Sequence, residues 1–246
     1  MSTISHDGRV QPLELGKTVF DFADDLAVEV PTSCGRNGKC HECVVEITSG
    51  MESLSPLSEF ESFLRGSYRL ACQAVVERVD REIHFKPLRR QPKILTLGQN
   101  KIHLDFDPIV TRQGLDVLYD GKVIDQYRGC IYGLAIDLGT TTVVVDLVNL
   151  ETGDSVDRLS FENPQRFGGS DVMHRISYDG GPHRGELQKA IVTAINRSIR
   201  TLSRARKFPR RAIYEIIVAG NSSMRDLLFG LDIQSIGQKP YKSKIE

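Results

Sequence analysis

Four cysteines are placed so that three lie close together and the fourth lies far along the chain. Cys34, Cys40 and Cys43 form a C-x5-C-x2-C run, and Cys72 follows much later in the stretch Leu-Ala-Cys-Gln. To bring these four thiols together, the chain must form a tight loop and return to it from a distant segment. This requirement constrains the fold of the whole N-terminal part more than any other sequence feature.

Thiolates are soft ligands that suit iron. The run is one residue longer in its first gap than the C-x4-C-x2-C pattern of plant-type [2Fe–2S] proteins, in which each iron takes two thiolates. Gly35 and Gly38 allow tight bends that bring backbone N–H groups toward the sulfurs. The spacing therefore predicts a [2Fe–2S] cluster and one-electron transfer. The predicted ligands are Cys34, Cys40, Cys43 and Cys72.

Three other interpretations of these cysteines stay open. A structural zinc site typically pairs two short cysteine knuckles, and Cys72 has no near partner in sequence. A disulfide framework is typical of secreted proteins, whereas the N-terminus resembles no secretory signal. Four unrelated buried thiols would leave the grouping of three unexplained.

Length and composition narrow the class of protein. A chain of 246 residues can hold two domains, and 40% apolar and 26% charged residues are typical of soluble globular proteins. The formal net charge is zero, so we expect no nucleic-acid partner and no anionic membrane. No apolar run reaches the roughly 20 residues of a membrane helix. We therefore expect a cytoplasmic protein, in a compartment where reduced thiols are available.

Residues 1–86 show the strand and turn signals of an α+β domain, with a mixed sheet and a helix packed across it. Asp-Gly is a hairpin-turn pair, Thr is a good helix cap, and Ser-Pro often begins a helix. The predicted elements are a hairpin turn at 6–9, a short helix capped by Thr18, strands at 43–48 and 82–85, and a second helix that begins at Ser55-Pro56 and continues through Leu57, Phe60, Phe63 and Leu64.

Four stretches of this part resemble the plant/vertebrate-type [2Fe–2S] ferredoxin domain. They are Pro31-Thr32-Ser33-Cys34-Gly35, Gly38-Lys39-Cys40, Cys43, and Arg69-Leu70-Ala71-Cys72-Gln73. The resemblance covers about residues 1–86 and implies a β-grasp-like mixed sheet around the cluster.

Residues 87–131 are interpreted as a linker that holds a small hairpin. The stretch 86–93 has two prolines and four positive charges, which indicates an exposed, extended segment. A basic docking patch for an acidic redox partner is an alternative for the same stretch. Strands are expected at 101–106 and at 115–119 before a turn.

Residues 132–142 carry the second chemical motif. An apolar strand ends at Asp137, turns through Gly139, and leads through three threonines into the strand 143–148, with a third strand at 155–161. Gly139 permits close approach of a phosphate, and Asp137 can hold a hydrated Mg²⁺. No Gly-Lys-Ser/Thr follows at Walker spacing, so this is not a P-loop. A hairpin with a threonine-rich turn and no ligand is the alternative.

The stretch Ala135–Thr141 looks like the first phosphate loop of the actin, hexokinase and heat-shock-chaperone ATPase superfamily. Within it, the chain resembles the family of reductive activators of corrinoid-dependent enzymes, which join a ferredoxin domain to this α/β ATPase fold and restore Co(II) corrinoids to Co(I) with ATP. Further matching stretches are Asn163-Pro164-Gln165, Gly168-Gly169-Ser170-Asp171-Val172 and Val218-Ala219-Gly220-Asn221-Ser222-Ser223-Met224.

The resemblance implies a set of site residues, cofactors and partners. The implied partners are a corrinoid protein or corrinoid methyltransferase and an external reductant, and the implied cofactors are the cluster and ATP with Mg²⁺. The implied nucleotide-binding residues are Asp137, Gly139, Thr140, Thr141 and Thr142. The alternative function is a simple ferredoxin-type electron carrier for an oxygenase or reductase.

The remainder of the region predicts a partial actin/hexokinase-like lobe over 132–246. A helical stripe over 187–202, a buried strand at 214–218 and a helix from Met224 are expected. The sequence given stops before any segment that resembles the second lobe of the superfamily. We therefore expect a truncated ATPase domain that lacks complete ATP binding and ATPase activity.

Overall fold

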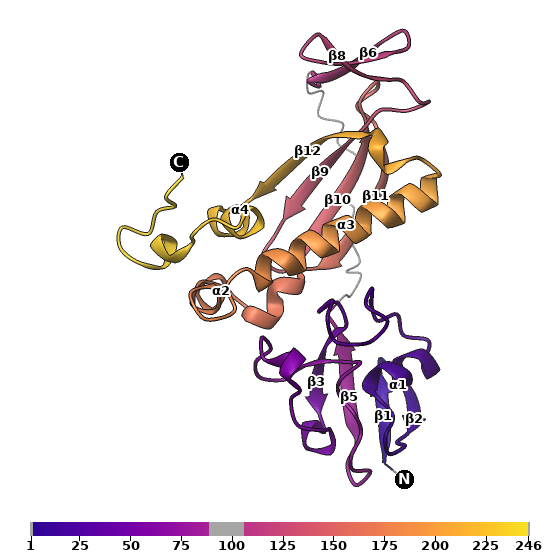
Figure 1. Ribbon diagram of the computed structural model, residues 1–246, viewed down its shortest axis with the longest axis vertical. Helices are drawn as coiled ribbons and strands as arrows, with labels where there is room; N and C mark the ends of the chain where they lie inside the picture. The colour runs from indigo at the N-terminus through magenta and orange to yellow at the C-terminus, as the bar shows by residue number, and fades with distance from the viewer. Residues whose placement is uncertain (1, 89–105, 246) are drawn as a thin grey trace. The chain divides into compact units, whose positions relative to one another are not determined.

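The structure, a computed structural model, describes residues 2–88 and 106–245. By packing, the chain divides into two compact units. The first is Met1–Arg90 with Pro164–Ile191, and the second is Gln91–Asn163 with Val192–Glu246 (Figure 1). The division by sequence at 1–86, 87–131 and 132–246 is a different partition and stays a prediction.

A five-stranded sheet forms the centre of the first unit. The strand order is β2-β1-β5-β3-β4. β1 and β5 pair in parallel and the other neighbours pair antiparallel, so the predicted mixed sheet is confirmed. The predicted hairpin turn is confirmed at Asp7-Gly8, where both residues have positive φ. The strands are β1 (Thr3–His6), β2 (Arg9–Pro12), β3 (Val44–Ser49), β4 (Tyr68–Leu70) and β5 (Ile83–Pro87).

Helix α1 (Val19–Asp25) packs its apolar side chains into this unit. Thr18 caps the helix as predicted, because its side chain accepts the N–H of Asp21 while the Asp21 carboxylate accepts the N–H of Thr18. The buried residues are Val19, Phe20, Phe22 and Ala23.

The predicted helix from Ser55-Pro56 is wrong. The structure has two short 3-10 turns there, η1 (Met51–Ser53) and η2 (Glu59–Glu61), and the cap of the second turn is Ser58. The carbonyl groups of Ser55 and Pro56 accept hydrogen bonds from Arg69, and the Ser55 N–H donates to Val75. These distant partners hold the Ser-Pro stretch in an extended conformation and override the local helix signal.

The rest of the first unit comes from the middle of the chain. It contains the 3-10 turn η3 (Pro164–Gly168), helix α2 (Val172–Asp179) and the beginning of helix α3 (Glu186–Arg206). Asp171 caps α2 by accepting the N–H of His174. The predicted helical stripe over 187–202 is confirmed, since Leu187, Ile191, Ile195 and Leu202 are buried on α3.

A four-stranded sheet organises the second unit. The order is β11-β10-β9-β12, and β12 is parallel to β9 while the other pairs are antiparallel. The three-strand meander predicted from the sequence is confirmed. The strands are β9 (Tyr132–Leu138), β10 (Thr142–Asn149), β11 (Ser155–Glu162) and β12 (Ile213–Gly220).

Strand β12 was predicted to be buried, and this is wrong. It lies at the edge of the sheet, and Ile216 and Ile217 are 52% and 67% exposed. An apolar run does not reveal whether both faces of a strand are covered. After β12 come the predicted helix, α4 (Ser222–Phe229), and the 3-10 turn η5 (Gln234–Gly237), while the 3-10 turn η4 (Arg210–Ala212) precedes the strand.

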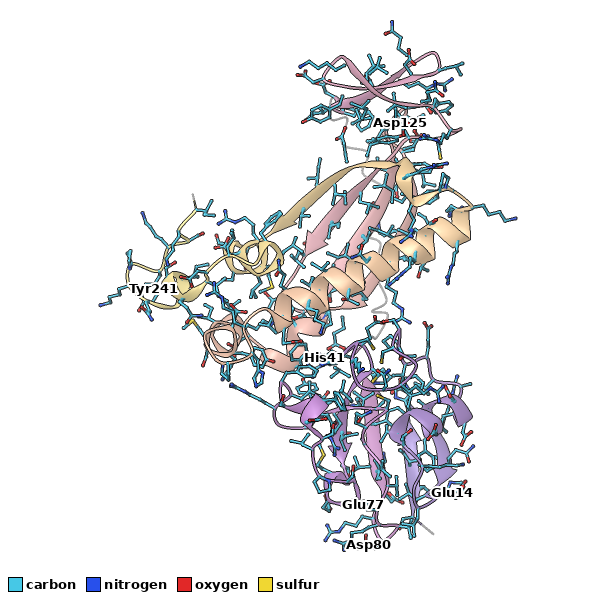
Figure 2. All side chains as sticks on the ribbon, in the orientation of Figure 1. Glu14, His41, Glu77, Asp80, Asp125 and Tyr241 are labelled. Atoms are coloured by element: carbon cyan, nitrogen blue, oxygen red, sulfur yellow. The ribbon has the colours of Figure 1, made fainter. Side chains whose placement is uncertain are left out.

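A small three-stranded sheet of β6 (Val110–Gln113), β7 (Asp116–Tyr119) and β8 (Lys122–Gln126) completes the second unit. It differs from the predicted hairpin, because only β7 matches a predicted strand, at 115–119, while β6 and β8 were not predicted. Asp125, labelled in Figure 2, accepts the hydroxyl of Tyr214 at 3.0 Å. Residues 89–105 lie outside the described residues, and with them residues 101–105 of the predicted strand and residues 89–93 of the predicted extended stretch. Within the described part of the chain, no helix is long and apolar enough to span a membrane.

Candidate functional site

The four predicted thiols lie together in the first unit as two pairs. The Sγ atoms of Cys43 and Cys72 are 3.4 Å apart, and both residues are buried. Cys34 and Cys40 are half-buried, and the N–H and thiol of Cys40 hydrogen-bond to the Cys34 sulfur. Over residues 2–88 and 106–245, no three metal-binding side chains are grouped to hold a single metal ion. Two thiol pairs instead suit a two-iron cluster, in which each iron takes two thiolates.

Hydrogen bonds from the loop favour the thiolate form at one sulfur of each pair. Burial opposes ionisation of Cys34, but the N–H and thiol of Cys40 and the N–H groups of Asn37 and Lys39 together lower the pKa of Cys34 to about 7. The thiol of Cys43, against the opposing effect of burial, is the main cause that lowers the pKa of Cys72 to about 6. A thiol must lose its proton to bind iron, so these donors prepare the site for metal.

Left-handed backbone shapes the cysteine loop. Gly35, Arg36, Gly38 and His41 have φ values of 66°, 67°, 80° and 59°. At Gly38 a Cβ would also lie 2.8 Å from the Cγ atom of Phe60. Position 38 therefore requires glycine for two reasons: the backbone has a positive φ, and a neighbouring ring leaves no space for a Cβ.

Arg36 ties the cysteine loop to helix α1. Its guanidinium lies 4.0 Å from the ring centroid of Phe20 and donates to Asp21 and Asp24. Burial opposes ionisation of Asp21, but hydrogen bonds from Thr18 and the charge of Arg36 lower the pKa of Asp21. The loop is thus attached to α1 through its own Arg36, which stacks on an aromatic ring of the helix and pairs with two of its carboxylates.

A buried ion pair fixes the segment that carries Cys72. Glu61 is 0% exposed and Arg69 is 2% exposed, and the Glu61 carboxylate accepts from the Arg69 Nε at 2.8 Å and from the Leu70 N–H at 2.9 Å. Burial would raise the pKa of Glu61, but these donors and the Ser58 N–H lower it. The ion pair therefore sets the backbone two residues before Cys72.

His41, labelled in Figure 2, lies between two of the cysteines and is half-buried in the first unit. Its ring stacks on Phe63 with 4.0 Å between centroids, and its Nδ1 lies 2.9 Å from the Glu186 carboxylate. The Tyr178 hydroxyl donates to the Phe63 carbonyl at 2.6 Å. One side of the cysteine loop is thereby covered by the unit's own side chains.

The second predicted group of residues lies at a hairpin in the second unit. Asp137 is the penultimate residue of β9, Gly139, Thr140 and Thr141 form the turn, and Thr142 begins β10. The Gly139 N–H donates to the Thr142 carbonyl at 3.1 Å. A Cβ at Gly139 would lie 2.5 Å from that same carbonyl oxygen. The tight turn therefore requires glycine for space.

The hairpin lies beside the end of the parallel strand β12. Gly220 pairs with Leu138, and a Cβ at Gly220 would lie 3.0 Å from the Leu138 carbonyl oxygen. Two glycines, Gly139 and Gly220, therefore stand at the adjacent carboxyl ends of β9 and β12. In open α/β sheets, ligands bind outside the carboxyl ends of parallel strands.

Four residues that shape these sites were given no role by sequence reasoning. Arg36 and Glu61 hold the cysteine loop, and Asn163 and Asn221 contact the hairpin. The sequence carried a signal for two of them. Ser58-x-x-Glu61 is a capping box, and Asn221 precedes a helix at the cap position.

Comparison with known proteins identifies both parts of the chain. Residues 3–77 match the family model of the 2Fe-2S iron-sulfur cluster binding domain, and residues 132–246 match that of the RACo middle region. A 2Fe-2S ferredoxin of Pseudomonas aeruginosa is 31% identical over 81 residues, which is 30% of this chain and 72% of that protein.

Two relatives match nearly the whole chain. The corrinoid activation enzyme RamQ of Eubacterium limosum is 23% identical over 264 residues, 91% of this chain and 44% of RamQ. A solved structure of a reductive activator for corrinoid, iron-sulfur protein is 22% identical to this chain, with a TM-score of 0.52. The matched region covers 99% of this chain and 50% of the solved chain. That likeness shows a shared fold, and the chain spans about half the length of these relatives. The chain therefore joins a 2Fe–2S ferredoxin-family domain to a RACo middle region, and it is homologous to the reductive activators of corrinoid proteins.

Proposed function

We propose that this chain carries one electron at a time to a Co(II) corrinoid protein and so takes part in reductive activation to Co(I). The observation that carries the proposal is the arrangement of Cys34, Cys40, Cys43 and Cys72 as two thiol pairs in the ferredoxin-family domain. The names of the relatives that match over most of the chain supply the corrinoid partner. An external low-potential reductant supplies the electron.

The chain's own residues prepare and tune the cluster site. A bound [2Fe–2S] cluster supplies one-electron chemistry. The N–H groups of Asn37, Lys39 and Cys40 donate to the Cys34 sulfur, and the Gln73 Nε2 donates to the Cys72 sulfur at 3.4 Å. Donors to ligand sulfurs stabilise negative charge there, and this raises the reduction potential.

The test separates cluster binding from electron delivery. Reconstitution with iron and sulfide should give about two irons per chain. Cys72→Ser should lose most of this iron, whereas Cys130→Ser, at the fifth cysteine, should keep it. The reduced protein should then deplete the Co(II) absorption band of a corrinoid protein. An intact, reduced cluster that leaves that band unchanged would contradict the corrinoid function and favour a simple ferredoxin-type carrier.

We also propose that residues 132–246 form a partial actin/hexokinase-like lobe whose hairpin binds the phosphates of Mg²⁺–ATP. The support is the meeting of two glycines at the carboxyl ends of the parallel strands β9 and β12. In this proposal Asp137 holds the hydrated Mg²⁺, and Gly139 with the threonines Thr140, Thr141 and Thr142 contacts the phosphate oxygens.

Isothermal titration of the full chain with Mg²⁺–ADP and with inorganic phosphate tests this second proposal. Asp137→Asn should weaken Mg²⁺–ADP more than phosphate alone, because only the first ligand brings the cation. Asp120→Asn, at an exposed turn of the small sheet, should bind as the wild type does. Equal affinities in wild type and Asp137→Asn would contradict the assigned role of Asp137.

A further inference from the structure

The turn of the phosphate hairpin is held by asparagine side chains from outside it. Asn163, directly after β11, donates its Nδ2 to the Gly139 carbonyl at 2.9 Å and its backbone N–H to the Thr141 carbonyl at 2.7 Å. Asn163 is 0% exposed, so its side chain has little freedom to move. Carbonyl oxygens repel an anion, and Asn163 forms hydrogen bonds with two carbonyl oxygens of the turn.

Asn221 connects the same turn to helix α4. Its Oδ1 accepts the Met224 N–H at 3.0 Å and so caps the helix. Its Nδ2 donates to the Thr140 Oγ1 at 3.3 Å. Because an N–H can only be accepted by the amide oxygen, the capping bond determines that the amide nitrogen faces Thr140.

The two contacts of Asn221 require different atoms. Helix capping needs an oxygen, and serine or aspartate supplies one about as well as asparagine. The contact to Thr140 needs the amide nitrogen as well. The capping role alone therefore does not account for an amide at position 221, whereas contact with a hydroxyl in the turn does.

We propose that Asn221 is a positioning residue for phosphate binding, which it aids by orienting the Thr140 hydroxyl. This inference rests on the proposed phosphate function of the hairpin. A hydroxyl that accepts an amide N–H directs its own hydrogen away from that amide, where it can donate. Asn221 thus sets the direction in which Thr140 donates toward an oxyanion, while Asn163 holds the backbone of the turn.

Substitutions at position 221 separate positioning from capping. Asn221→Ser keeps a capping oxygen and removes the amide nitrogen, whereas Asn221→Ala removes both. We expect both variants to bind Mg²⁺–ADP and inorganic phosphate roughly two- to tenfold more weakly, the effect of one neutral hydrogen bond. Only Asn221→Ala should also unfold at a lower temperature. Wild-type affinity in Asn221→Ser, with weak binding in Asn221→Ala, would overturn the proposal and leave a capping residue.

A double substitution tests whether the effect passes through Thr140. Thr140→Val removes the hydroxyl, and Thr140→Ser keeps it as the matched control. If Asn221 acts through that hydroxyl, adding Asn221→Ser to Thr140→Val should cause no further loss of affinity. Additive losses would show that Asn221 acts elsewhere and would overturn the proposal.

A readout without ligand separates this inference from the phosphate function itself. In NMR spectra of the ligand-free chain, Asn221→Ser should shift the amide signals of Thr140 and Thr141 and leave those of β6–β8 unchanged. Unshifted turn signals would overturn the positioning role. Shifted turn signals in a chain that binds neither probe would instead overturn the phosphate function, and the proposal with it.

Discussion

The cysteine loop and the threonine hairpin each bring several side chains together, and they do so in opposite ways. The cysteine loop has no regular backbone, and side-chain contacts hold it: Arg36 of the loop binds helix α1, and Glu61 binds the Cys72 segment through Arg69 and the Leu70 N–H. The hairpin lies at the end of paired strands, and strand register places its residues. The loop should therefore be sensitive to distant side chains, and the hairpin to backbone space.

The largest effect should come from the buried ion pair. Arg69→Ala leaves the Glu61 carboxylate buried without its cation, which costs about 3–5 kcal/mol of unfolding free energy. Chemical denaturation of the chain measures it. As a control, Arg78→Ala breaks an exposed pair with Asp80 (labelled in Figure 2) and should leave stability close to that of the wild type. Equal effects in the two variants would contradict the idea that buried side chains hold the loop.

In the hairpin, the largest loss of stability should come from adding one carbon atom at Gly139. Gly139→Ala places a Cβ against the Thr142 carbonyl, where only the backbone can move, and should cost about 1–3 kcal/mol. Gly153→Ala is not a clean control, because Gly153 has positive φ and faces the Phe106 ring. Gly185→Ala serves better, because it has positive φ but open space and so isolates backbone strain. A Gly139→Ala chain as stable as the wild type would contradict the requirement for backbone space in this turn.

The outer attachment of the cysteine loop should contribute less. Arg36→Ala removes the stacking on Phe20 and the pairs with Asp21 and Asp24, and should cost about 0.5–1 kcal/mol. We also expect faster loss of iron to a chelator, because a freer loop opens more often. Arg112→Ala removes a similar stack, on Tyr127 in the second unit, and should not change the rate of iron loss. Equal rates of iron loss in wild type and Arg36→Ala would contradict a role for Arg36 in holding the loop.

The smallest expected effect is the loss of stability when Glu61 becomes protonated. It appears only in acid and leaves stability at neutral pH unchanged. Its folded-state pKa lies below the unfolded value of about 4.3, so its contribution is fully present above about pH 4.3. That contribution is lost as pH falls through the folded pKa. Thermal unfolding followed from about pH 7 down to about pH 3 measures this loss, and Glu61→Gln should lack that part of the acid response. Identical pH profiles would contradict it.

The pairing of the predicted thiols and the hairpin at residues 137–142 were predictable from sequence, because residue type and spacing constrain the backbone there. Three cysteines in one short run can only lie on one loop, and an apolar strand that ends in Asp-x-Gly followed by threonines can turn in few ways. The positions of the supporting residues were not predictable. Whether Arg36 reaches α1 depends on how the loop packs, and whether Asn163 reaches Gly139 depends on the register of β10 and β11.

The two errors in the fold have the same origin. Ser55-Pro56 is a good local start for a helix. Arg69, however, donates hydrogen bonds to the Ser55 and Pro56 carbonyls, and these bonds keep the stretch extended. The apolar run of β12 predicts a buried strand, but the strand lies at the edge of its sheet. Local patterns give the type of an element, and contacts between distant segments decide its context.

The parallel pairing of β12 with β9 also has a consequence for the order of folding. Thr142 and Glu162 pair across a short hairpin, whereas Ile213 must find Tyr132 from a much greater distance along the chain. Local contacts form first, so the β9–β11 meander and its turn should be complete before β12 arrives with Asn221. Opening of the edge strand would then release Asn221 while the meander stays folded. Amide hydrogen exchange should accordingly protect β9 and β10 more strongly than β12.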